Sequence, residues 1–239
     1  MKIVAHRCGD THFPEETIEA ARHALAVGAD YLEIDVRYTA SGSPVVVHDD
    51  NLRRLFGIER RIAEIDDQSF RALRHDGSQQ HRPHFFREFL ETGLAPLLLH
   101  IKEGGARLAQ LIEELDRFHY TERVVFGVVA LDDLRTVKRV NAAHKALAFM
   151  SRPDDWRDFV EAGVDVVRLW DDWVATSLVE EIQAAGRKVW VMTGGASANG
   201  VGITTAERLL ELGRLGVDGV LVNDVPQAVR AYADGGERR

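Results

Sequence analysis

Apolar residues along the chain follow two alternating patterns, short continuous runs and longer segments with helical spacing. The runs have the length and composition of buried strands. They centre on Ile3, Leu32, Leu98, Val125, Leu147, Val167, Val189 and Val220. In the longer segments apolar residues recur every three or four positions, as at Leu108, Leu111 and Leu115, which places them on one side of a helix. Strands that alternate with such helices are typical of a parallel sheet with right-handed crossovers.

Eight strand centres are the number that closes a (β/α)8 barrel, the TIM barrel. We therefore predict this fold for a single domain over 1–239, with an open doubly wound sheet as the alternative. The first strand is expected at 2–5 and the second from Tyr31. The later strands are expected at 96–102, 123–129, 146–150, 164–170, 188–193 and 217–222. The helices are expected at 17–27, 105–118, 132–141, 154–162, 176–185, 204–214 and 226–234.

A ninth apolar run, at 45–47, follows the second strand too closely to take a place in the barrel. A turn signal at 41–44 precedes it, so we expect a hairpin that folds back above the rim. The residues from 51 to 77 are charged and only loosely periodic. We interpret 51–90 as a small insertion after the second strand, with an amphipathic piece at 65–73 and a short helix at 83–90.

The insertion carries three histidines, His75, His81 and His84. No cysteine accompanies them, and their spacing does not match that of structural zinc sites. We therefore expect these side chains to lie in solvent.

Composition indicates which partners the protein is not expected to bind and where in the cell it is expected. The chain has 38 acidic and 30 basic residues and a formal net charge of −8, which argues against nucleic acid as a partner. No stretch approaches the roughly 18 apolar residues of a membrane span, so stable membrane insertion is not expected. The single Cys8 cannot form an internal disulfide and no targeting segment is visible, so we expect a cytoplasmic protein. The sequence leaves a homo-oligomer open.

Two acidic residues, Glu33 and Asp35, alternate with Leu32 and Ile34 in the second strand. Successive side chains of a strand point to opposite faces, so both carboxylates share one face, with α-carbons roughly 6 to 7 Å apart. This spacing lets the two groups bind one hard cation. The alternative is a solvated outer face of the sheet.

Other chemically active side chains lie near the ends of the neighbouring strands. In a barrel of this type the carboxyl ends of all strands meet on one face, where the active site lies. The candidates that converge there are His6 and Arg7 after strand one, Glu33 and Asp35 in strand two, His48 after the hairpin, and His100 and Lys102 at the end of strand three.

This set of side chains suits a phosphoryl group. Arg7 offers a bidentate fork for two phosphate oxygens, and Lys102 offers a point charge. A divalent ion held by the carboxylates stabilises charge on phosphate. Two histidines beside the phosphorus allow one to accept the proton of the attacking oxygen and the other to protonate the leaving oxygen. A phosphodiester needs the second transfer because an alkoxide is a poor leaving group.

The candidate residues lie in motifs that resemble those of the glycerophosphodiester phosphodiesterase family. The motifs are His6-Arg7, Pro14-Glu15-x-Thr17, Gly28-Ala29-Asp30-x-x-Glu33-x-Asp35-Val36, Val46-x-His48-Asp49-x-x-Leu52, the strand that ends in x-x-Lys102, and Gly216-Val217-Asp218-Gly219-Val220 followed by Asp224-x-Pro226. The resemblance runs from residue 3 to about residue 228 and is strongest over the first 52 residues.

The resemblance implies a barrel with an insertion after the His-Asp segment, which matches 51–90 here. It implies the hydrolysis of a small-molecule glycerophosphodiester to glycerol 3-phosphate and an alcohol. In the related phospholipase-type mechanism, the neighbouring glycerol hydroxyl attacks first and gives a cyclic phosphate that water then opens.

The resemblance also implies a divalent metal ion, usually Mg²⁺ or Ca²⁺, held by the residues that match Glu33 and Asp35. A third metal-binding position of the family falls on His100. The remaining matches are His6 and His48 as acid and base, and Arg7 and Lys102 as phosphate-binding residues.

This chain departs from the family pattern at three positions. Cys8 replaces a glycine, Glu16 replaces an asparagine, and His100 replaces the third metal-binding glutamate. Imidazole binds Mn²⁺, Zn²⁺ or Fe²⁺ more readily than it binds Mg²⁺ or Ca²⁺, which prefer oxygen. The replacement also removes one negative charge, which Glu15 or Glu16 would restore by leaning towards the ion.

Two alternative functions stay open at this point. One is a lysophospholipase D-like phosphodiesterase, which would need an apolar rim near the site. The other is a barrel that binds a phosphorylated ligand but has lost catalysis through the change at His100.

Overall fold

Eight parallel strands form the centre of the molecule. The computed structural model describes residues 1–9, 12–78, 80–195 and 200–234. In order around the barrel the strands are β1 (Lys2–Ala5), β2 (Tyr31–Tyr38), β5 (Leu97–Ile101), β6 (Val124–Val128), β7 (Lys145–Phe149), β8 (Val166–Trp170), β9 (Lys188–Met192) and β10 (Gly219–Val222). The ring is closed because β1 pairs with both β2 and β10. The predicted (β/α)8 barrel is confirmed.

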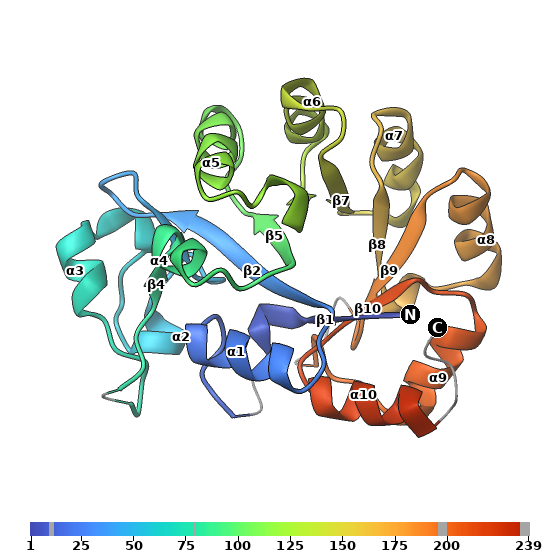
Figure 1. The fold of residues 1–239 in the computed structure, drawn as a ribbon, viewed down its shortest axis with the longest axis horizontal. Helices are drawn as coiled ribbons and strands as arrows, with labels where there is room; N and C mark the ends of the chain where they lie inside the picture. Colours follow the sequence, from blue (N-terminus) through green and yellow to red (C-terminus); the bar gives the residue numbers. More distant parts are fainter. Residues whose placement is uncertain (10–11, 79, 196–199, 235–239) are drawn as a thin grey trace.

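Helices surround the strands on the outside (Figure 1). They are α1 (Ile18–Ala26), α5 (Ala106–Arg117), α6 (Leu131–Val140), α7 (Trp156–Glu161), α8 (Thr176–Ala184), α9 (Ala206–Arg214) and α10 (Val225–Asp234). All seven coincide with predicted helices, with ends that shift by up to two residues. The helix predicted from 154 begins only at Trp156, because residues 153–155 form a 3-10 turn, η4 (Pro153–Asp155), in front of α7.

The barrel strands are buried on both faces, which explains their nearly continuous apolar sequences. One set of side chains packs inside the barrel, with Val4, Leu98, Leu147 and Leu221 fully buried. The alternate set packs against the helices in a larger core. Since side chains fill the interior, the chemically active side chains are expected at the carboxyl ends of the strands, where active sites of this fold lie.

The insertion after β2 contains more regular structure than its sequence indicated. Together with the hairpin strand β3 (Pro44–Val46), which precedes it, its elements are α2 (Arg53–Phe56), η2 (Ile62–Glu64), α3 (Asp67–Ala72), β4 (His84–Phe85) and α4 (Phe86–Glu91). The predicted hairpin is present, because β3 pairs antiparallel with β2. The helix predicted at 83–90 begins only at Phe86. His84 and Phe85 instead pair with Val46 and Val45 and cover the open edge of β3.

The insertion has an apolar core of its own, and this core buries two histidines. Val45, Leu52 and Phe70 are fully buried in it. His75 is 5% exposed and lies against the Phe56 ring, and His84 is also buried. The expectation that these histidines lie in solvent is therefore wrong.

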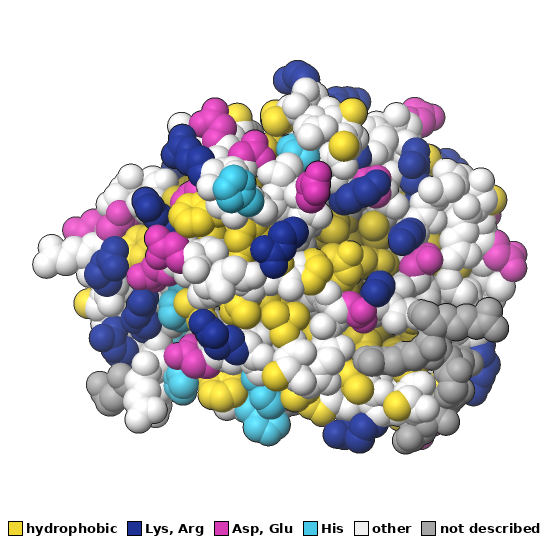
Figure 2. Space-filling model, viewed as in Figure 1, with side chains coloured by type: hydrophobic (Ala, Val, Ile, Leu, Met, Phe, Trp, Pro, Cys, Tyr) yellow, Lys and Arg dark blue, Asp and Glu magenta, His cyan; other side chains and the backbone are white. Residues whose placement is uncertain are grey.

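The outer surface shows no charge of a single sign on the face drawn in Figure 2, where acidic and basic side chains are interspersed. Across the described ranges, every helix is too short or too polar to cross a lipid bilayer.

Candidate active site

The first barrel strand ends in a strained turn. The 3-10 turn η1 (His6–Cys8) follows β1 directly, and Arg7 and Cys8 have left-handed backbone conformations with φ of 50° and 65°. Residues other than glycine rarely adopt this conformation, and those that do are concentrated at functional sites. The turn directs the Arg7 backbone N–H at Glu33, whose Oε2 accepts it at 2.7 Å. The end of β1 is thereby fixed against the acidic pair.

The two acidic residues of β2 are buried beside an imidazole. Glu33 is 1% exposed and Asp35 is fully buried, so the interpretation as a solvated face is wrong. The parallel pairing of β2 with β5 places Asp35 opposite His100. One ligand atom from each of Glu33, Asp35 and His100 lies within 4.8 Å of the other two.

Two cationic or hydrogen-bonding groups stabilise the Asp35 carboxylate. Its Oδ1 lies 2.8 Å from Lys102 Nζ and 2.8 Å from His100 Nδ1. Burial alone would raise the pKa of Asp35, but Lys102 and His100 outweigh it and hold this pKa well below its usual range. Asp35 is therefore an anion at neutral pH.

This donor set fits a divalent cation. The carboxylates of Glu33 and Asp35 supply hard oxygen donors, and His100 supplies a nitrogen donor of borderline softness. Asp35 Oδ2 has no hydrogen-bond partner among the described residues, so it is free to bind an ion. These three residues therefore form a candidate metal site, the metal-binding cluster.

Glu16 lies next to this cluster and contacts the backbone of Asp35. Its Oε1 accepts the backbone N–H of Asp35 at 2.6 Å. Burial, together with the nearby Asp35, raises the pKa of Glu16 well above its usual range, which disfavours its charged form. Burial also raises the pKa of the Cys8 thiol, which disfavours Cys8 as a nucleophile.

His6 is held in one tautomer by a residue from the other end of the chain. Asn223, directly after β10, donates from Nδ2 to the Val201 carbonyl at 3.0 Å, so its Oδ1 faces His6 Nδ1 at 2.7 Å. An amide oxygen only accepts, so Nδ1 carries the proton and Nε2 is left as a base. Burial lowers the pKa of His6 and keeps the ring neutral.

His48 is held by charged neighbours. Its Nδ1 lies 2.8 Å from Asp49 Oδ1, and Arg54 Nε donates to the other oxygen at 2.7 Å. Burial opposes ionisation of Asp49, but the hydrogen bonds with His48 and Arg54 hold the pKa of Asp49 well below its usual range. The His48 carbonyl accepts from Arg37 Nε at 2.7 Å, which fastens this segment to β2.

The two predicted phosphate-binding cations both have carboxylate partners. Arg7 Nη1 lies 3.2 Å from Glu15 Oε1, and Glu15 is itself bridged by both terminal nitrogens of Arg54. Lys102 pairs with Asp35. A phosphate that binds either cation therefore competes with a carboxylate already in place.

A stack of side chains that the sequence analysis missed lies beside the metal-binding cluster. The ring of Phe149 stacks on His100 with centroids 3.8 Å apart and planes 12° apart. The Arg168 guanidinium lies over both Phe149 and Trp170, 5.1 and 4.2 Å from the ring centroids. The available signal was a lone arginine within the apolar β8 run, on the same strand face as Trp170.

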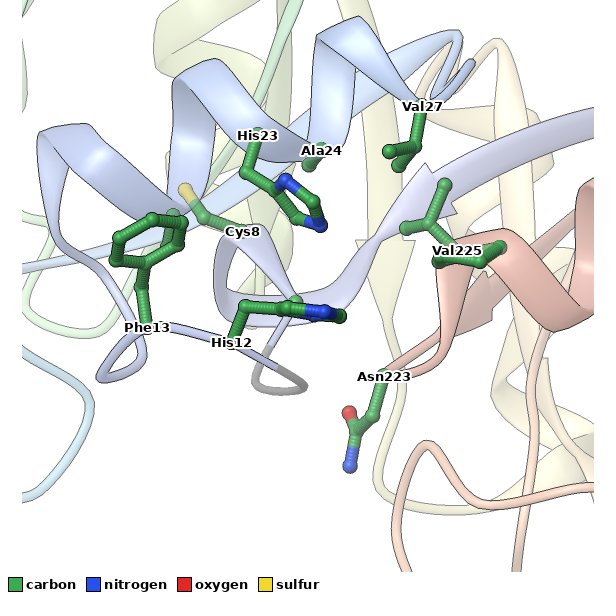
Figure 3. A pocket seen from close by; sticks show the side chains of 11 residues that line it. Cys8, His12, Phe13, His23, Ala24, Val27, Asn223 and Val225 are labelled. Atoms are coloured by element: carbon green, nitrogen blue, oxygen red, sulfur yellow. The ribbon is translucent and has the colours of Figure 1, made fainter.

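A pocket behind the η1 turn is too small for a substrate. Cys8, His12 and His23 line it between η1 and α1, while the side chain of Asn223 points away from it (Figure 3). Its volume of about 10 Å³ is close to that of a single water-sized probe. Its size excludes it as a substrate site, and neither Glu33 nor Asp35 is among the residues that line it.

Comparison with known proteins identifies the family to which this arrangement belongs. The sequence model of the glycerophosphoryl diester phosphodiesterase family matches residues 6–147, which include every predicted site residue. The chain belongs to this family. It is a phosphodiesterase, a hydrolase of phosphoric diesters, and the resemblance noted in its motifs is confirmed.

Relatives of this phosphodiesterase include a protein of similar length and a longer one. The glycerophosphodiester phosphodiesterase of Caldanaerobacter subterraneus subsp. tengcongensis is 23% identical over 249 residues, which is 98% of both chains. The lysophospholipase D GDPD3 of Mus musculus is 27% identical over 66% of this chain, which spans 51% of the mouse protein.

Solved structures share the barrel of this phosphodiesterase. An Oleispira antarctica phosphodiesterase, solved in complex with sn-glycerol-3-phosphate, matches with a TM-score of 0.84 and 22% identity over 98% of this chain and 97% of that one. A Silicibacter pomeroyi structure described as a putative glycerophosphoryl diester phosphodiesterase matches with a TM-score of 0.82 and 22% identity, over 99% and 94% of the chains. At these identities the match establishes the fold alone.

Proposed function

We propose that this phosphodiesterase hydrolyses glycerophosphodiesters to glycerol 3-phosphate and an alcohol, with residues 1–239 acting as one catalytic domain. The observation that carries the proposal is the cluster of Glu33, Asp35 and His100, whose ligand atoms lie within 4.8 Å of one another next to two oriented histidines. The complex of the Oleispira protein with glycerol 3-phosphate supports the choice of product.

One divalent ion is the cofactor, held by Glu33, Asp35 and His100. When bound, it neutralises charge on the phosphoryl group and polarises the phosphorus towards attack. The family resemblance favours Mg²⁺ or Ca²⁺, whereas the nitrogen donor of His100 favours Mn²⁺, Zn²⁺ or Fe²⁺.

The two histidines divide the proton transfers according to their partners. His6 is neutral and has Nε2 free, so it accepts the proton of the attacking oxygen. His48 is oriented through the contact of its Nδ1 with Asp49, so we assign to it the protonation of the leaving alkoxide. Each histidine transfers one proton through one ring nitrogen. Because Nδ1 of each ring already has a partner, Nε2 is the nitrogen available for the transfer.

Arg7 and Lys102 bind the non-bridging oxygens of the phosphoryl group. Arg7 exchanges its contact with Glu15 for the substrate, and Lys102 shares its charge between Asp35 and the phosphate. The carboxylate partners keep both cations in position before the substrate arrives, so less side-chain entropy is lost on binding.

The test is release of glycerol 3-phosphate from glycerophosphocholine and glycerophosphoethanolamine, after chelation and then with Mg²⁺, Ca²⁺, Mn²⁺, Co²⁺ or Zn²⁺ restored singly. We expect turnover that the chelator abolishes and at least one ion restores, and that Glu33→Gln lowers at least 100-fold. Absence of turnover with all five ions contradicts the proposal. If glycerol 3-phosphate still binds under those conditions, the barrel is a ligand-binding protein that has lost catalysis.

A lysophospholipase D-like activity is the second candidate. The observation in its favour is a pair of exposed apolar side chains after barrel strands, Val129 after β6 at 44% exposure and Ile203 after β9 at 60%. Faster turnover of detergent-dispersed lysophosphatidylcholine than of glycerophosphocholine, with a loss of this preference in Val129→Ser and Ile203→Ser, would establish it. Equal or slower turnover of the lysolipid excludes it.

A further inference from the structure

A buried arginine lies inside the barrel without an anionic partner. Arg168, in the middle of β8, is 4% exposed and shares the interior strand face with Val166 and Trp170. Among the described residues, its Nε and Nη1 atoms have no hydrogen-bond partner, and Glu33 acts on it by charge alone, without a hydrogen bond. It therefore differs from Arg7 and Lys102, which both contact carboxylates.

Burial of an unpaired guanidinium is unfavourable, because it loses hydration and gains no hydrogen bonds. Burial lowers the pKa of Arg168 to about 9, although the negative charge of Glu33 opposes the shift. At neutral pH the side chain still carries its charge. Locally unfavourable arrangements of this kind are concentrated at functional sites, so a ligand that satisfies the cation is expected.

The position of Arg168 in the barrel indicates where that ligand sits. Strand β8 is four strands from β2 in either direction around the ring, so Arg168 faces the acidic pair from the opposite wall. Phe149 and Trp170 hold the guanidinium through its faces but offer no acceptor for its N–H groups. Through the Phe149 ring, Arg168 belongs to the same stack as His100.

We propose that Arg168 binds the phosphoryl oxygens of substrate and product from the wall opposite the metal ligands. The ligand is a tetrahedral phosphate group that contacts the metal-binding cluster of Glu33, Asp35 and His100 on one side and the planar fork of Arg168 on the other. The inference rests on the proposed function, because it assumes that the phosphate binds at this cluster.

The experiment compares Arg168→Met and Arg168→Lys with the unaltered protein by calorimetric titration of glycerol 3-phosphate, with and without added Mn²⁺. We expect Arg168→Met to weaken binding about 10- to 100-fold, because hydrogen bonds to a charged group are lost. Arg168→Lys keeps a point charge but lacks the planar fork, so its affinity should lie between those of the unaltered protein and Arg168→Met. The melting temperature of ligand-free Arg168→Met should equal or exceed that of the unaltered protein, since an unpaired buried charge is removed.

Lys138→Met is the matched control. Lys138 is a partly buried cation that pairs with Asp165, just before β8, at 2.6 Å. Its loss should lower the melting temperature and leave affinity for glycerol 3-phosphate unchanged, which is the signature of a structural role.

Three results would overturn the inference. The first is an unchanged affinity of Arg168→Met for glycerol 3-phosphate. The second is the result expected of Lys138→Met, a lower melting temperature with unchanged affinity, in Arg168→Met. The third is absence of glycerol 3-phosphate binding by the unaltered protein. The proposed function fails separately, if the protein releases no glycerol 3-phosphate from diesters while it still binds this product through Arg168.

Discussion

At the scale of single residues, His100 belongs to two arrangements at once. Its ring lies in the candidate metal site with Glu33 and Asp35 and also stacks flat on Phe149. A glutamate at this position would add a charge and an oxygen donor but would lose the ring contact. We therefore expect the imidazole to link metal preference to the packing of the barrel wall.

The substitution His100→Glu tests this link. We expect the ratio of kcat/KM with Mg²⁺ to kcat/KM with Mn²⁺ to rise about tenfold, because Mg²⁺ prefers oxygen donors. Loss of the stacked pair should lower stability by about 1 kcal/mol. His100→Gln serves as the control, since it supplies an oxygen without a charge. An unchanged ratio would show that His100 does not bind the ion.

Asn223 affects His6 through a single hydrogen bond, and replacement of Asn223 tests the assigned tautomer. In Asn223→Ala we expect kcat to fall about 100-fold or more with little change in KM, because the ring no longer favours the Nε2 base. Asn223→Asp keeps an acceptor at Nδ1 and should retain the tautomer. Ring ¹⁵N NMR shifts of His6, assigned by comparison with His6→Gln, report the tautomer directly. An Asn223→Ala protein with normal kcat would contradict the assignment.

At the scale of elements, the start of α1 sets the position of the acidic residues that precede it. Thr17 caps the helix by accepting the Ala20 N–H at 3.1 Å, and its hydroxyl donates to the Pro14 carbonyl at 2.8 Å. Between these contacts, Glu15 pairs with Arg7, and Glu16 has a left-handed backbone with φ of 59°. The cap therefore organises a segment of the site as well as a helix.

Removal of the cap by Thr17→Ala should lower the free energy of unfolding by about 1 kcal/mol. We also expect weaker binding of glycerol 3-phosphate, since Glu15 no longer holds Arg7 in place. Chemical denaturation measures the first effect and calorimetry the second. Thr17→Ser retains the hydroxyl and should behave almost normally; equal losses in the two variants would exclude the cap as the cause.

At the scale of the whole molecule, the insertion folds around an apolar core of its own, and His75 is buried against Phe56 of this core. Burial lowers the pKa of His75 to about 4, against about 6.5 in the unfolded chain. Between pH 6.5 and 4 the unfolded state therefore binds more protons. Stability contributed by the neutral ring is complete above this window and is lost as the pH falls through it.

Urea denaturation at pH 7 and pH 4.5 measures this loss. His75 should contribute about 2 to 3 kcal/mol to the decrease on acidification. The glutamine in His75→Gln cannot titrate, so the free energy of unfolding of this variant should decrease less between pH 7 and pH 4.5, by the amount that His75 contributes. The same pH dependence in both proteins would assign the decrease to other groups, of which His81 and His84 lie nearest in the insertion.

The sequence by itself determined the barrel fold and which polar residues lie together on its first three strands. Alternation along a strand and spacing along a helix are local properties, so they predicted the eight strands and the shared face of Glu33 and Asp35. The same local pattern placed His48 at the end of a hairpin. It could not separate a buried from a solvated acidic face, because both show the same alternation.

Only the tertiary structure decided which distant groups meet. Asn223 reaches His6 because β10 closes the ring against β1, and Arg168 faces Glu33 because β8 lies half a ring from β2. The burial of His75 likewise follows from packing within the insertion. Such contacts depend on ring closure and on the packing of segments far apart in the chain, which leave no periodic signal in the sequence around any one of these residues.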